Sequence, residues 1–221
     1  MYSSRMNPLP PPSRLVSEKL GLPAGRSRGF HVVWGPHGVS QWVLEALCPL
    51  LEGAAKVYWV DAANRFDAHG FAKAAQVLGL DPRATLSRVH LARTFNAFQL
   101  AALVAGKLPR LPVAPVVLAD PLAPFYDADL ALEDARRAFD RLRFGLADVP
   151  GPVLVLLVDR PAPPDRGFFS ALLLDQAQTV TRISGTATAL AEVPRGSGPP
   201  PSVGISATGR ISGTGLPVLE N

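Results

Sequence analysis

The sequence predicts an α/β protein in which helices cover both faces of a mostly parallel β-sheet. Short apolar segments recur along the chain, and longer segments whose apolar residues have helical spacing separate them. Two of the short segments, 116–119 and 153–158, contain no polar residue, which is typical of strands that are buried on both faces. Apolar strands that alternate with helices in this way form parallel sheets.

The elements follow one another in a regular order. The expected strands are residues 30–34, 57–60, 88–92, 116–119 and 153–158, with helices at 41–51, 68–78, 97–107 and 127–146 between them. Ser40 and Asn96 precede two of these helices, where a short polar side chain caps the first turn. After residue 160 the pattern changes to alternation, which predicts antiparallel edge strands at 179–183, 186–193 and 203–207, with a Pro/Gly/Ser-rich connection at 194–202.

Length and composition predict one domain. The chain has 221 residues, of which 48% are hydrophobic, and this is enough for a single buried core. We expect a disordered, proline-rich basic arm at 1–14, a domain at 15–215 and a tail at 216–221. The single cysteine, Cys48, excludes an internal disulfide and a cysteine-rich metal centre. No apolar run is long enough to span a membrane, and the N-terminus has no secretory signal, so we expect a cytoplasmic protein.

The net charge of +4 is unevenly distributed along the sequence. Residues 1–30 contain five basic residues, including Arg26 and Arg28, against one glutamate, so this segment alone has a charge of +4. Such an arm is suited to docking on nucleic acid or on an acidic partner. A solvated tail without a partner is the alternative interpretation.

The first strand-to-helix turn is where nucleotide-binding α/β folds hold phosphate. Here it has the sequence Gly35-Pro36-His37-Gly38-Val39-Ser40-Gln41-Trp42. In the pattern G-x-x-x-x-G-K-[ST], Gly35 fits the first glycine. Ser40 then replaces the second glycine, Gln41 the phosphate-binding lysine and Trp42 the hydroxyl residue. The turn is either a plain tight turn or a degenerate phosphate loop.

Residues 15–215 resemble the RecA superfamily, closest to the RadA-type recombinases. The similar segments are Asp61-Ala62-Ala63-Asn64-Arg65-Phe66, Leu78-Gly79-Leu80-Asp81-Pro82, Ala92-Arg93-Thr94-Phe95-Asn96-Ala97-Phe98-Gln99 and the Walker B-like run 116–121. The resemblance implies a RecA-like three-layer fold and places Asp120 at the family's magnesium-site aspartate. Ala63 stands where the family has the glutamate that activates water. Together with Gln41 and Trp42, this predicts a degenerate ATPase with no catalytic residue, cofactor or metal.

The family's DNA-binding loops follow the fourth and fifth strands, which are residues 121–128 and 160–169 here. The second loop has Arg160 and Arg166 beside Phe168 and Phe169, and basic and aromatic side chains together bind single strands. The alternative is that the two phenylalanines begin the next core element. Arginines between 136 and 143 form either a second basic patch or pairs with acids of their own helix.

The resemblance implies a non-catalytic accessory protein of DNA repair or damage tolerance. It is similar in this respect to the ImuA-like proteins, which act in SOS mutagenesis and error-prone translesion synthesis. The expected partners are DNA, preferably single-stranded, a RecA-type recombinase, a Y-family polymerase and further copies of the chain. Two alternatives stay open: an atypical DNA-dependent ATPase or recombinase paralogue, and an α/β protein-interaction scaffold unrelated to DNA.

Overall fold

The structure, a computed structural model, describes residues 29–51, 56–183 and 190–192. Its strands are β1 (Phe30–Gly35), β2 (Val57–Asp61), β3 (Val89–Arg93), β4 (Val116–Ala119), β5 (Val153–Val158), β6 (Thr179–Ile183) and β7 (Leu190–Glu192). Its α-helices are α2 (Val39–Leu47), α3 (Ala68–Val77), α4 (Pro82–Leu86), α5 (Ala97–Ala102), α6 (Leu132–Ala147) and α7 (Phe168–Gln176). The predicted arm at 1–14, the tail at 216–221 and the strand at 203–207 lie outside the described residues.

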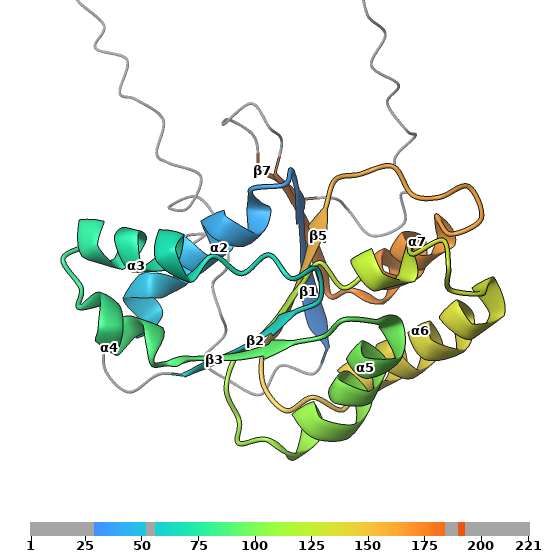
Figure 1. The fold of residues 1–221 in the computed structure, drawn as a ribbon, viewed down its shortest axis with the longest axis horizontal. Coiled ribbons are helices and arrows are strands. Elements are labelled where there is room, and N and C mark those ends of the chain that lie inside the picture. The colour runs from blue at the N-terminus through green and yellow to red at the C-terminus, as the bar shows by residue number, and fades with distance from the viewer. Residues whose placement is uncertain (1–28, 52–55, 184–189, 193–221) are drawn as a thin grey trace, which may run out of the picture.

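The strands form one sheet in the order β3-β2-β4-β5-β1-β6-β7. All pairings from β3 to β6 are parallel, so the sheet has six parallel strands, one more than the five that the sequence predicts (Figure 1). β7 pairs antiparallel with β6 over three residues. This arrangement is α/β and is consistent with a RecA-like three-layer fold.

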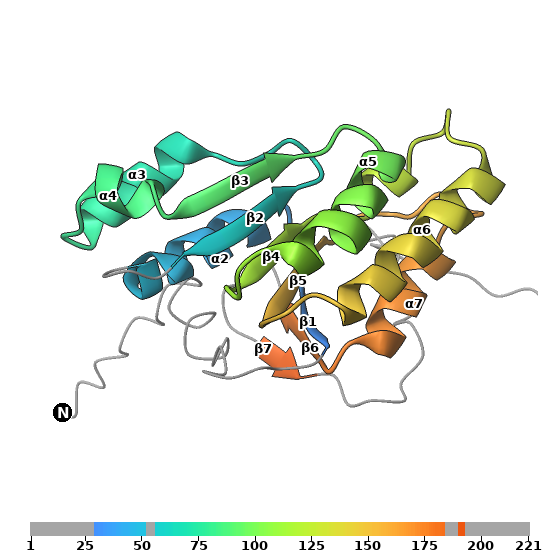
Figure 2. The ribbon, with the colours of Figure 1, turned by 90° about the horizontal axis from the view of Figure 1, so that it is seen from below.

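Helices cover both faces of the sheet. Helices α2, α3 and α4 lie on one side and α5, α6 and α7 on the other, as the two views show (Figures 1 and 2). Each face has its own apolar core, one built with α2 and α3 and the other with α5, α6 and α7. The sheet is therefore the middle of three layers, and the polar ends of its strands remain available for a site.

Strand β5 shows why the sheet is buried on both faces. Its six residues are all apolar and all buried. Alternate side chains point to opposite faces, so Val153, Val155 and Leu157 join the α5–α7 core. The other three residues join the α2–α3 core. Each buried side chain of this size contributes about 1.5–3 kcal/mol of burial free energy, which makes β5 a central source of stability.

Some element boundaries and one strand direction differ from the sequence-based prediction. Helix α2 begins at Val39, so Ser40 lies inside it and Gly38 is the N-cap residue. The prediction for Asn96 is confirmed, because its side chain accepts from the Gln99 amide at 2.9 Å. The expected antiparallel strand at 179–183 is β6, which pairs antiparallel with β7 but runs parallel to β1 on its other side. Alternating polarity indicates a half-buried strand but does not specify its direction.

Candidate functional site

The polar residues of the sheet converge at one edge. Since β1, β2, β4 and β5 are parallel, their carboxyl ends lie side by side. A cleft of about 150 Å³ opens there. We call it the carboxyl-edge cleft, and it is lined by His37, Ser40, Gln41, Leu44, Trp59, Asp61, Ala63, Arg65, Phe66, Asp67, Ala119, Asp120 and Val158. Ligand pockets for drug-sized molecules usually measure about 300–1,000 Å³, so this cleft has room only for a small group.

Asp61, at the end of β2, organises the turn that follows it. Its carboxylate is buried and accepts hydrogen bonds from the backbone amides of Arg65 and Phe66, both at 2.9 Å. Asn64, inside the turn, has a φ of 56°, a left-handed conformation that asparagine tolerates better than most residues. The Arg93 Nε atom lies 3.6 Å from the same carboxylate. Both oxygens of the Asp61 carboxylate are therefore engaged by groups of the protein itself.

Asp120, which follows β4, is the second buried carboxylate of the cleft. Its Oδ1 atom accepts from the Arg160 guanidinium, whereas its Oδ2 atom is buried and has no hydrogen-bond partner. Burial raises the pKa of the Asp120 carboxyl, and cationic neighbours, Arg160 first among them, lower it in part. Its φ of 52° is also left-handed. Buried charge and backbone strain therefore coincide at this residue, as is common at functional sites.

Arg65 and His37 connect two turns across the mouth of the cleft. The Arg65 guanidinium donates to His37 Nδ1 at 2.9 Å, which places the proton of a neutral imidazole on Nε2. Both side chains are exposed. The protein's own cations thus lie beside the buried carboxylates of the cleft. Arg160 forms an ion pair with Asp120, and Arg93 forms one with Asp61.

The turn between β1 and α2 has no room for a phosphate loop. Only Pro36, His37 and Gly38 lie between the strand and the helix, and the Val39 amide closes the turn on the Pro36 carbonyl at 2.8 Å. The position of the second glycine in the phosphate pattern, Ser40, is already helical. A cradle of backbone amides around a phosphate therefore does not form here.

Gly35 and Trp42 have packing roles at this turn. A Cβ atom on Gly35 would lie 3.2 Å from side-chain atoms of Ile183 and Val39, so glycine is needed for close approach. The Trp42 indole lies over Gly38, within 3.4 Å of where a Cβ atom would stand. Gln41 donates to Glu45 of its own helix at 3.2 Å. These contacts favour the interpretation of the segment as a plain tight turn.

A magnesium ion, which the resemblance implies at Asp120, does not fit these residues. One oxygen of Asp120 already accepts from Arg160. Among the residues that the structure describes, no three His, Cys, Asp or Glu side chains form a group that would hold a metal.

The predicted DNA-contact loop at 160–169 is folded against the protein. Arg166 is only 5% exposed, and its guanidinium donates to the carbonyls of Phe125 and Leu130. Phe169 is fully buried against Phe125 and Phe139. The prediction that Arg166 and Phe169 contact DNA is therefore wrong for this conformation, because the same side chains build the core.

The other two predicted contacts of this loop are also engaged. Phe168 is half-buried beneath the Arg136 guanidinium, which lies 5.0 Å from the ring centroid. Arg160 pairs with Asp120 and lies 5.9 Å from the Tyr126 ring centroid. Arg26 and Arg28, the contacts predicted in the arm, lie outside the described residues.

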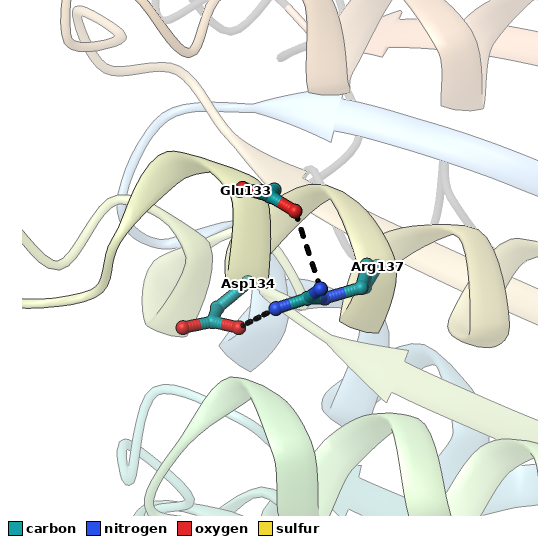
Figure 3. Close-up of polar contacts among 3 residues, drawn as sticks. All are labelled: Glu133, Asp134 and Arg137. Carbon is teal, nitrogen blue, oxygen red and sulfur yellow. Dashed lines mark hydrogen bonds and ion pairs between the residues drawn. The ribbon is translucent and has the colours of Figure 1, made fainter.

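Two of the four arginines of α6 pair with acids of the same helix. Arg137 pairs with Glu133 at 3.2 Å and with Asp134 at 2.5 Å (Figure 3). Arg143 pairs with Asp140 at 2.7 Å. Of the two interpretations of this helix, the structure thus favours internal pairing over a basic patch.

Arg65 lines the cleft and Arg93 pairs with Asp61 there, but the sequence analysis selected neither arginine as a candidate site residue. Arg65 lies in the segment that resembles the family's second strand end, and Arg93 ends β3. The sequence contained a signal for both residues, because each arginine lies at or just after the carboxyl end of a predicted strand. Their convergence on Asp61 depends on the pairing of β2 with β3, which the sequence pattern does not specify.

Comparison with known proteins identifies no relative of this chain. No protein-family model matches the chain, and a search of curated proteins finds no similar sequence. In the described ranges, none of the helices has the length and apolar character required to cross a bilayer. The class that fold and cleft define is therefore a three-layer α/β protein whose strand-end cleft is occupied by internal ion pairs.

Proposed function

We propose that the protein is a non-catalytic, RecA-like accessory protein of DNA repair or damage tolerance. The observation that supports this most strongly is the state of the carboxyl-edge cleft. Arginines of the protein itself neutralise the aspartates there, and a three-residue turn replaces the phosphate loop. The molecule keeps the layered sheet but lacks the lysine and the glutamate that the chemistry needs.

The loss of the phosphate-loop lysine weakens the binding of a nucleotide as well as its hydrolysis. A phosphate-loop lysine supplies the charge that meets the terminal phosphates, and Gln41 supplies none. With about 150 Å³ available, the cleft does not enclose a nucleoside triphosphate. Activity then depends on surfaces that bind partners. The connection with DNA rests on the resemblance of segments such as 92–99 to the RadA-type recombinases.

The test is an ATP hydrolysis assay on the full chain, with and without single-stranded DNA. We expect no turnover above background under either condition, and the same result for Asp120→Asn. ATP turnover that single-stranded DNA stimulates and that Asp120→Asn abolishes would show a true ATPase and refute the proposal.

A second measurement addresses the DNA-related part of the proposal. We expect salt-dependent binding to an oligonucleotide, because phosphate contacts release counterions. An absence of binding at low salt would leave an α/β scaffold unrelated to DNA as the better account.

A further inference from the structure

One part of the sequence lacks acidic residues altogether. Residues 82–119 contain Arg83, Arg88, Arg93, Lys107 and Arg110 but neither aspartate nor glutamate. The segment includes β3, which is the edge strand at one side of the described sheet. A local excess of positive charge is therefore concentrated along and around this edge.

The arginines of this segment differ in how far neighbouring acids neutralise them. Within the described ranges, Arg83 and Arg88 have no ion-pair partner among the salt bridges of the structure. Arg93 lies 3.6 Å from the buried Asp61, yet its side chain stays 46% exposed. Arg137 of α6, by contrast, pairs with two acids one turn away (Figure 3).

Two exposed aromatic rings continue the edge beyond β3. Phe95 is 73% exposed and Phe98 is 51% exposed. Their backbone is fixed, because the Phe95 amide donates to Gln99 Oε1 at 3.0 Å and Asn96 caps α5. Rings held in this way offer stacking surface at little further entropic cost.

We propose that the β3 edge surface, formed by Arg83, Arg88, Arg93, Phe95 and Phe98, binds single-stranded nucleic acid. The arginines neutralise backbone phosphates, and the two phenylalanines stack on bases. Arg88 directly precedes β3 and Arg93 is its last residue, so their Cα atoms are about 16 Å apart along the edge of the sheet. This inference rests on the proposed function and replaces the loop 160–169 as the DNA contact.

The chemistry of the surface favours a nucleic acid strand over a protein segment. An acidic peptide would satisfy the arginines, whereas a single strand satisfies the arginines with its phosphates and also offers the π-face of each base to the two exposed rings. The absence of acids across residues 82–119 also removes the repulsion that phosphates would otherwise meet.

The experiment measures fluorescence anisotropy of a labelled oligothymidine of about 20 nucleotides with the full chain at several salt concentrations. Phe95→Ala and Phe98→Ala should each weaken binding by about 5- to 150-fold at fixed salt, with the salt slope nearly unchanged. Arg88→Ala should reduce the slope of log affinity against log salt by about 0.7. Phe95 and Phe98 are both exposed, and a thermal melt of each variant verifies folding.

Two variants on α6 serve as matched controls. Phe144 is 60% exposed, so Phe144→Ala removes a comparable ring from another surface. Arg137→Ala removes an arginine that is already paired. Both should bind as the wild type does.

Three outcomes are distinguishable. Selective loss in the β3 edge variants supports the inference. Wild-type DNA binding that survives unchanged in Phe95→Ala and Phe98→Ala overturns this surface and leaves the proposed function standing. No binding by the wild type at low salt overturns both, and assigns the exposed edge to an acidic protein segment instead.

Discussion

Arg166 holds the loop between β5 and α7 against the core. Its guanidinium is buried and donates to two backbone carbonyls, those of Phe125 and Leu130. Arg166→Met would leave both carbonyls without these partners, at about 1–3 kcal/mol for each unsatisfied group. We expect the free energy of unfolding in urea to fall by about 2–6 kcal/mol. The exposed Arg141→Met on α6 is the control, and an equally small loss in both variants would contradict this role.

Asp120 should make stability depend on pH in a particular direction. Because burial raises its pKa in the folded state, the ionised form is the unfavourable one, and the fold is most favoured when this carboxyl is protonated. Its contribution to stability is fully present below the unfolded pKa and is lost as the pH rises through the folded pKa. Asp120→Asn keeps a residue that tolerates the φ of 52° and removes the charge.

Thermal melts of Asp120→Asn and wild type between pH 4 and pH 7 test this direction. We expect the variant to be at least as stable as the wild type at pH 7. Its advantage should shrink as the pH falls. A marked loss of stability at pH 7 would mean that the ion pair with Arg160 outweighs the cost of burial.

At the scale of elements, the contact between α6 and the π-helix η2 (Leu103–Lys107) is the tightest backbone approach that involves a helical glycine. A Cβ atom on Gly145 would lie 2.5 Å from the Ala105 Cα atom, and backbone cannot move aside cheaply. Gly145→Ala should therefore lower the free energy of unfolding by about 1–3 kcal/mol or more, as overpacking does. The measurement is chemical denaturation of the purified variant.

Gly106→Ala is the matched control for this contact. Gly106 lies in η2, and a Cβ atom there would meet nothing within 4 Å. Alanine is favoured over glycine in a helical segment by about 0.5–1 kcal/mol, so this variant should be equal to or more stable than the wild type. Similar stability of both variants would show that the helices do not approach as closely as the structure has them.

The sequence pattern predicts the elements unevenly, for physical reasons. β4 and β5 are uninterrupted apolar runs, and such runs are easily identified as buried strands. Helix α7 has the sequence FFSALLLDQ, whose apolar residues surround the helix instead of forming one stripe, so no helical period is visible. The parallel direction of β6 depends on its pairing with β1, a contact between distant parts of the chain.

The same limitation applies to the candidate site. Asp61 and Asp120 are predictable as strand-end aspartates, because parallel strands present their carboxyl ends together. That Arg160 would neutralise Asp120 depends on β4 and β5 being neighbours, which is a property of strand order. The burial of Phe169 likewise follows from the aromatic contacts with Phe125 and Phe139, which come from separate elements.

At the scale of the whole molecule, the sheet lies between two layers of helices, and arginines of the protein itself pair with the two buried aspartates of its strand-end cleft. Asp61 and Asp120 have arginine partners, and Arg65 donates to His37 at the mouth of the cleft. The functional contact that we propose lies on the outer surface near β3, where Phe95 and Phe98 are exposed. The central claim is therefore that nucleotide does not bind in the cleft.

A thermal melt with and without millimolar Mg·ATP tests this claim most directly. A ligand at 100 times its Kd stabilises the folded state by about 2.7 kcal/mol. In a protein of this size, that corresponds to a rise in Tm of about 5–10 °C. We expect Mg·ATP to shift the Tm of this protein by less than about 1 °C. A magnesium-dependent rise of several degrees that Asp120→Asn abolishes would contradict it.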